Sequence, residues 1–120
     1  MAHDFTSDQA LDLDPRVLQA TLGHNAVDRQ LMMLVFEMTL STSLREMESA
    51  LHNQDWLEAG DVAFHIKTSA QAIGAFRLAD AMARAERAAH AHQTDVLLAL
   101  HADLPVLVSA LTASQRALLH

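Results

Sequence analysis

The chain has 120 residues, a formal net charge of −7 and eight Lys and Arg residues, and it contains no cysteine. Because nucleic-acid binding depends on clustered basic residues, this composition argues against a nucleic-acid partner. The lack of cysteine excludes disulfide bonds, thiolate catalysis and zinc sites built on sulfur. The length suits a single domain.

The residue types predict an all-α fold. Alanine, leucine and methionine are frequent, whereas there are three glycines, two prolines and 4% aromatic residues. The sequence contains no run of alternating β-branched residues of the kind that would indicate a strand. The N-terminal sequence MAHDFTSDQALDLD lacks the basic start and apolar run of a signal peptide, and we expect no apolar stretch of membrane-spanning length elsewhere. A soluble, cytoplasmic protein is therefore expected, without a membrane partner.

The first predicted elements are a mobile N-terminal arm over residues 1–12 and a short helix. Asp14 can cap this helix, Pro15 suits its first position, and Gly23 can end it.

A long second helix is expected to start at Asn25 or Asp28 and to end near residues 52–54. Apolar side chains at three- and four-residue intervals predict its buried face. They are Leu31, Leu34, Val35, Met38, Leu44, Met47 and Leu51.

A third helix is expected from Asp55, its cap, to Ile73. Gly74 breaks the helical pattern, and a fourth helix follows over Ala75–Ala91.

Thr94 and Asp95 begin a fifth helix, Val96–Leu119, which Pro105 is expected to kink or to split in two. Four substantial helices joined by short loops predict an antiparallel up-down-up-down bundle, to which the first helix is a short addition. Residues 13–120 would form this single bundle domain.

The third helix presents a core face and an outward face. At about 100° per residue, six residues gather within an arc of roughly 100° and form the predicted core face. They are Ala59, Val62, Ala63, Ile66, Ala70 and Ile73. Phe64 lies about 150° from the centre of that face, so this large aromatic side chain is directed at water. Its neighbours on the outward face are Gly60, Lys67, Thr68 and Gln71.

His65 lies at the flank of the same helix, about 110° from the centre of the core face and one turn from Asp61 and Ser69. The other histidines form no recognisable metal site, because His90 and His92 are two residues apart and lie on opposite sides of a helix. Neither a metal nor another cofactor is expected.

The segment AFHIKTSAQAIGAFRLA, residues 63–79, resembles the signature helix of histidine phosphotransfer (HPt) domains. The pattern of that family is similar to A-H-x-L-K-G-S-A-x-x-[ILV]-G-A, followed by a helix with L-A at its fourth and fifth positions. The similarity extends over most of the chain, since LDPRVLQATLG matches the usual opening, ALHNQDW the end of the second helix and IGAFRLA the join into the fourth. The resemblance implies an HPt-like helical bundle with a phosphorylatable histidine on an exposed face.

At the reactive position this sequence departs from the pattern. A match without gaps puts Phe64 in the place of the histidine, with His65 one residue later. Thr68 replaces the glycine that leaves room for a receiver domain to approach, whereas Lys67 keeps the place of the lysine that steadies the phosphoryl charge. Phe64 has no nitrogen that could attack phosphorus.

Three functions are consistent with this sequence. The resemblance implies a degenerate HPt-like protein of a two-component phosphorelay, which docks response-regulator receiver domains. Its partner-binding residues would be Gly60, Phe64, Lys67, Thr68 and Gln71. The alternative is an active phosphotransfer protein that relays phosphoryl groups through His65, and the second alternative is a scaffold or dimerisation bundle. None of these is a turnover enzyme. A sensor histidine kinase is a further candidate partner, and a monomer is favoured over a dimer.

Overall fold

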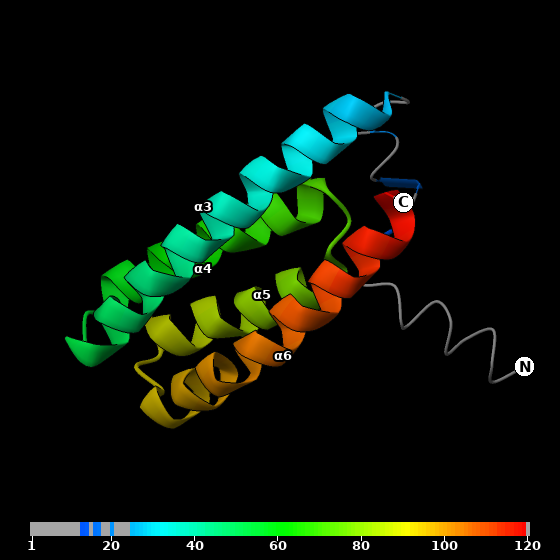
Figure 1. The fold of residues 1–120 in the computed structure, drawn as a ribbon. Coiled ribbons are helices and arrows are strands. Elements are labelled where there is room, and N and C mark those ends of the chain that lie inside the picture. The colour runs from blue at the N-terminus through cyan, green and yellow to red at the C-terminus, as the bar shows by residue number, and fades with distance from the viewer. Residues whose placement is uncertain (1–12, 15, 18–19, 21–24, 120) are drawn as a thin grey trace, which may run out of the picture.

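Four long helices make up most of the part of the chain that the structure describes (Figure 1). The structure is a computed structural model that describes residues 13–14, 16–17, 20 and 25–119, with side chains up to residue 113 except that of residue 26. The helices are α3 (Ala26–His52), α4 (Trp56–Ala72), α5 (Phe76–His90) and α6 (Thr94–Leu119). No strand occurs in these residues, which confirms the all-α prediction.

Cap residues read from the sequence set the starts of α3 and α4. The side chain of Asn25 accepts hydrogen bonds from the amides of Val27 and Asp28, so α3 starts at the earlier of its two predicted positions. Asp55 caps α4 through the amide of Glu58. Pro105 lies inside one continuous α6, so of the two outcomes predicted for this proline, a kink or a split, the split does not occur. A helix tolerates a proline when tertiary packing offsets the lost hydrogen bond.

The predicted arm over residues 1–12 and most of the predicted first helix lie outside the described residues. Of that helix, Arg16 and Val17 are helical, and the carboxylate of Asp14 accepts a hydrogen bond from the Arg16 amide. The Leu13 side chain is buried in the core, and the amide of Asp14 donates to the Gly74 carbonyl at 3.0 Å. This short stretch is therefore held against the α4–α5 turn.

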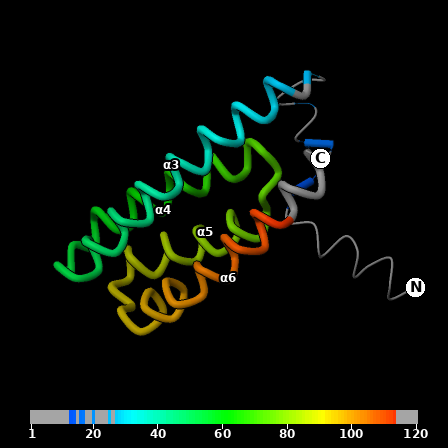
Figure 2. The backbone as a smooth tube through the Cα atoms, viewed as in Figure 1, coloured from blue at the N-terminus to red at the C-terminus, as the bar shows by residue number. Residues whose placement is uncertain are grey.

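The same three-residue turn joins each helix to the next (Figure 2). The middle residue of each turn has a positive φ: 55° at Gln54, 79° at Gly74 and 53° at His92. In each turn the following residue donates its amide five residues back, at 2.8 Å. These bonds are Asp55 N to Ala50 O, Ala75 N to Ala70 O, and Gln93 N to Ala88 O. The amides of Gln54, Gly74 and His92 each donate to the carbonyl three residues back, at 3.1–3.2 Å. The two sets of bonds form three Schellman motifs, which satisfy carbonyls at the helix ends.

Small side chains dominate the contact between α4 and α5. The buried residues of α4 are Ala59, Gly60, Val62, Ala63, Ile66 and Ala70. Those of α5 are Leu78, Ala79, Ala81, Met82, Ala85, Ala88 and Ala89. Because alanine and glycine side chains are small, α4 and α5 can approach closely. Larger residues such as Met33, Met47 and Leu97 fill the core from α3 and α6.

The buried face of α3 differs from the prediction. Leu31, Leu34, Val35 and Met38 are exposed, whereas Met33, Phe36 and Leu40 are buried together with the correctly predicted Met47. Leu44 and Leu51 are partly buried against the core. Residues 31–36 are all apolar, so their spacing does not indicate which side of the helix is buried. The choice follows from the second half of the helix, where Met47 and Ala50 continue the buried line while Arg45 and Ser49 continue the exposed one.

The apolar character of α6 is greater than the sequence analysis anticipated. By length and composition, Thr94–Ala113 could cross a membrane, with a mean hydropathy of 1.8. Four of its leucines, Leu97, Leu100, Leu104 and Leu111, are buried against the other helices. The apolar character of these four leucines is therefore explained by their packing in the core. Three other apolar residues of α6, Val96, Leu98 and Val106, remain exposed.

The left-handed turn at Gly74 generates a first prediction. An alanine Cβ at Gly74 would lie 3.0 Å from the Asp14 backbone nitrogen and 3.0 Å from the Val17 Cβ, in a conformation that side chains rarely adopt. We expect Gly74→Ala to lower the free energy of unfolding by about 1–3 kcal/mol in urea titrations.

Gly60→Ala is the matched control. Its added Cβ would meet Ala89 and His90 at ordinary contact distances of 3.5 Å. Since alanine favours the helix by up to about 1 kcal/mol over glycine, this variant should be neutral or more stable. Equal effects of the two substitutions would contradict the strained geometry assigned to Gly74.

Candidate functional site

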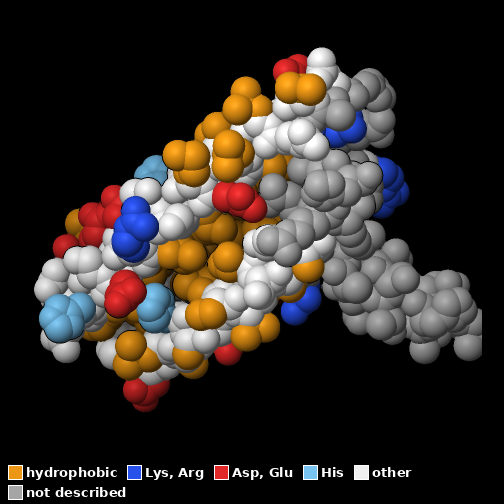
Figure 3. All heavy atoms as spheres, viewed as in Figure 1, with side chains coloured by type: hydrophobic (Ala, Val, Ile, Leu, Met, Phe, Trp, Pro, Cys, Tyr) orange, Lys and Arg blue, Asp and Glu red, His pale blue; other side chains and the backbone are white. Residues whose placement is uncertain are grey.

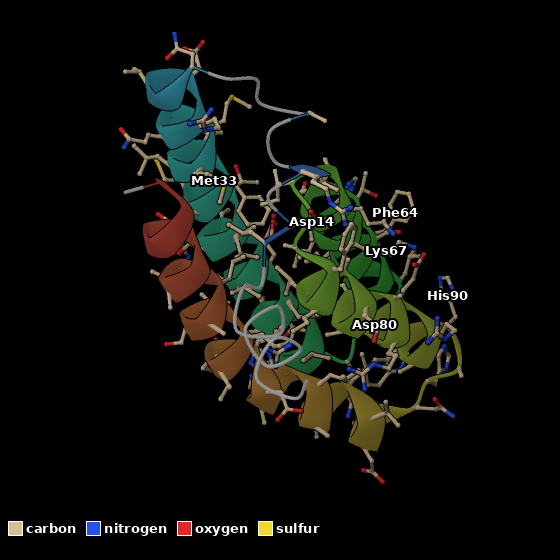
Figure 4. The ribbon with its side chains drawn as sticks, turned by 90° about the vertical axis from the view of Figure 1, so that its right-hand side faces the viewer. Asp14, Met33, Phe64, Lys67, Asp80 and His90 are labelled. Atoms are coloured by element: carbon tan, nitrogen blue, oxygen red, sulfur yellow. The ribbon has the colours of Figure 1, made fainter. Side chains whose placement is uncertain are left out.

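The position of Phe64 follows from the packing of α4. The predicted core residues of this helix are all buried, so the residues between them are directed away from the core. Phe64 is 46% exposed, as predicted from the helical rotation. Figure 4 shows Phe64 and Lys67 side by side on this helix, with His90 of α5 projecting on the same side of the molecule.

Three neighbours fix the surroundings of the Phe64 ring. The Lys67 Nζ lies 4.9 Å from the ring centroid, in a cation–π contact. The His65 ring is edge-on to it, with 5.9 Å between centroids. The Thr68 hydroxyl donates to the Phe64 carbonyl at 3.0 Å, one turn back along the helix. An exposed aromatic ring is thus framed by polar groups.

Lys67 is not the solvated side chain that its position on the helix suggested. Its Nζ donates to Glu86 Oε1 of α5 at 2.6 Å, and the two side chains are only 21% and 22% exposed. Lys67 therefore has its carboxylate partner within the domain. Sequence reasoning missed Glu86, because the register between α4 and α5 is needed to bring the two residues together.

Gly60 does not lie on the outward face where the sequence analysis placed it. It is buried, and a Cβ added there would meet the Ala89 Cβ and the His90 Nε2, both at 3.5 Å. Gly60 instead lets α5 pack against the first turns of α4. Thr68 and Gln71 are exposed, as predicted, so the outward face consists of Phe64, Thr68 and Gln71 with Lys67 at its α5 border.

His65 lies on the side of Phe64 that faces α3. It is exposed and lines a shallow hollow of about 590 Å³ between α3 and α4, together with the predicted neighbours Asp61 and Ser69. Phe64 itself forms one edge of the same hollow. The His65 imidazole forms no hydrogen bond within the described part of the chain. The other lining residues include Thr39, Ser43, Glu46 and Glu58. Three carboxylates, those of Glu46, Glu58 and Asp61, therefore line the same hollow as this histidine.

Comparison with protein-family models, with curated proteins and with solved structures found no match to this chain. The chemistry of the α4 face is therefore inferred from its own geometry.

Two further features lie away from this face. Over the described residues, no three His, Asp or Glu side chains are grouped so that they could hold a metal ion. A groove of about 760 Å³ runs between α3 and α6, with Leu44, Leu104 and Val108 on its walls. Figure 3 shows hydrophobic side chains in this hollow between the two helices.

The Lys67–Glu86 pair generates a second prediction. A double-mutant cycle with Lys67→Met and Glu86→Gln should give a coupling of about 1 kcal/mol in the free energy of unfolding, because both groups are largely shielded from water. The coupling should decrease in about 1 M salt.

The exposed Asp80–Arg84 pair on α5 is the control. Its atoms are 3.9 Å apart, and its side chains are 77% and 54% exposed. The same cycle with Asp80→Asn and Arg84→Met should give less than about 0.5 kcal/mol. A Lys67–Glu86 coupling no larger than this would mean that the ion pair does not form in solution.

Proposed function

We propose that this protein is a degenerate HPt-like module that docks response-regulator receiver domains without carrying phosphate. The observation that carries the proposal is the half-exposed Phe64, framed by Lys67 and Thr68, at the position where the HPt pattern has its histidine. Aromatic residues, phenylalanine among them, are enriched in protein interfaces, and large aromatic side chains often supply much of the binding energy. Such a module would act in the cytoplasm by occupying receivers, or by competing with active phosphotransfer proteins for them.

The fold supports the same proposal. We infer an up-down-up-down order for the four helices, because short turns favour antiparallel packing of neighbouring helices in a bundle. The contacts between α4 and α5 agree with a reversal, since Gly60 near the start of α4 meets Ala89 and His90 near the end of α5. A short helix at residues 14–23 completes the HPt-like architecture in this proposal.

Electrostatics favour docking over phosphoryl transfer. A phosphoryl group on an imidazole carries negative charge, and His65 lies in a hollow that Glu46, Glu58 and Asp61 make acidic. The lysine that would steady that charge is already bound to Glu86 at 2.6 Å. Neither feature hinders a partner that recognises the Phe64 ring.

Relay through His65 is the alternative, and it has one observation in its favour. The His65 imidazole is exposed and free of hydrogen bonds to the described residues, so its nitrogens are accessible. However, His65 is turned about 100° from Phe64 around the helix axis, and transfer requires close in-line alignment of the reacting atoms. A partner would have to approach from the α3 side.

The test is incubation with a panel of receiver domains charged by a small-molecule phosphodonor. We expect at least one receiver to bind, no acid-labile phosphate on this protein by intact mass, and unchanged binding by His65→Gln. Phe64→Ala should weaken binding about tenfold or more, as expected for a central aromatic contact.

Phe76→Ala provides the matched control, because Phe76 is 49% exposed but lies at the start of α5, beyond the α4–α5 turn. It should leave the affinity unchanged. Phosphate that appears on the protein and is lost in His65→Gln would establish the relay instead. Equal losses in Phe64→Ala and Phe76→Ala, or no binding to any receiver, would refute docking through the α4 face.

A further inference from the structure

A row of large apolar side chains runs along the outer side of α3. It consists of Val27, Leu31, Leu34 and Met38, which are between 50% and 70% exposed, and is called the outer α3 stripe below. The residues are spaced by four, three and four positions, so they form one line along the helix. At about 100° per residue, this line is opposite the buried line of Met33, Phe36 and Leu40.

The stripe forms one continuous line of exposed apolar side chains along α3. Isolated exposed leucines are common on soluble proteins and need no explanation, whereas the largest contiguous apolar patch of a protein is often functional. Val35, 47% exposed, widens the stripe on one side. The same line continues beyond Met38 as Thr42 and Arg45, both exposed, so the apolar part is confined to the first half of α3.

The surroundings of the stripe leave it accessible. Orange side chains follow the outer edge of α3 in Figure 3, and the first turns of this helix extend past the α4–α5 turn in Figure 1. The sequence analysis assigned Leu31, Leu34 and Met38 to the core and favoured a monomer. Because these side chains are instead exposed, α3 presents an apolar surface that a second copy can cover.

We infer that the outer α3 stripe is the contact of a symmetric dimer in which α3 packs antiparallel against α3 of a second copy. The alternating spacing of three and four residues is that of a coiled-coil seam, which suits packing against another helix of the same kind. A two-fold axis between Leu31 and Leu34 brings Leu31 against Leu34 of the partner subunit. It also brings Val27 against Met38 of the partner subunit, so every member of the stripe has an apolar neighbour.

Charge selects the antiparallel orientation. In a parallel pair, the seam would continue past Met38 and bring Arg45 against Arg45 of the partner subunit, a like-charge contact. In the antiparallel pair, the overlap ends at Val27 and Met38, so each Arg45 lies beyond it.

The available area predicts a weak dimer. The stripe and Val35 offer on the order of 400 Å² of apolar surface per copy, about half of what a standard interface buries on each side. With a polar rim, the pair would reach only the low end of specific interfaces. We therefore expect a dissociation constant in roughly the micromolar range.

This inference does not depend on the proposed function. The stripe faces away from the core, whereas His65 and Phe64 lie on α4, on the side lined by Thr39, Ser43 and Glu46 of α3. A dimer through the stripe would leave both α4 faces free for their partners.

Sedimentation velocity on the full chain, from about 1 to 300 µM, tests the association. The wild type should pass from the 13.1 kDa monomer toward twice that mass. Leu34→Glu should remain a monomer over the whole range, with an unchanged midpoint of urea unfolding because Leu34 is not a core residue. Leu57→Glu is the control, since Leu57 is 74% exposed on α4 and lies off the stripe; it should associate like the wild type.

Cysteine cross-linking tests the orientation, because the native chain has no cysteine. A mixture of Val27→Cys and Met38→Cys copies should form the mixed disulfide far faster than either variant links to itself. Rapid self-linking of Val27→Cys would indicate a parallel pair and overturn the antiparallel seam. A wild-type monomer at every concentration, or a dimer that Leu34→Glu leaves intact, would overturn the interface itself.

Discussion

The close contact between α4 and α5 is the constraint on which the rest of the structure depends. Gly60 and the alanines of both helices leave so little side-chain volume between them that an added Cβ at Gly60 would already touch Ala89. This closeness brings Lys67 within 2.6 Å of Glu86 and directs Phe64 outward. The bulky core residues of α3 and α6 then cover the other side of the α4–α5 pair. The position of the candidate site is therefore a result of small residues in its neighbour helix.

The charges around Phe64 divide the α4 face into two different environments. On the α5 side, the ammonium group of Lys67 contacts both the aromatic ring and the Glu86 carboxylate. The positive charge of Lys67 is therefore balanced within the domain. On the α3 side, His65 shares a hollow with three carboxylates. Between them, the Phe64 ring can lose water at little cost, because it carries no charge or hydrogen-bonding group to desolvate. The face suits recognition by contact better than it suits holding a phosphoryl group.

Much of the fold could be predicted from local signals. Asn25 and Asp55 cap the helices that they were predicted to start. Gly74 follows the end of α4 with the positive φ that glycine readily adopts. The exposure of Phe64 also followed from rotation about a single helix. The features that were predicted wrongly or missed all depend on how one helix packs against another. The apolar run of α3 could be buried on either side, Gly60 was placed by rotation without knowledge of α5, and the Lys67–Glu86 contact depends on a register that neither helix encodes alone.

The uneven packing of the four helices has a mechanical consequence. α4 and α5 interlock through small side chains, whereas α3 and α6 are separated along part of their length by a groove of about 760 Å³. Tightly packed helices move together, and small sliding displacements occur where packing is loose. A force applied to the exposed ring on α4 would therefore shift the α4–α5 pair as one body, and the width of the α3–α6 groove would change in response. The α3–α6 groove, where the molecule deforms most easily, thus lies on the face opposite the one that a partner would contact.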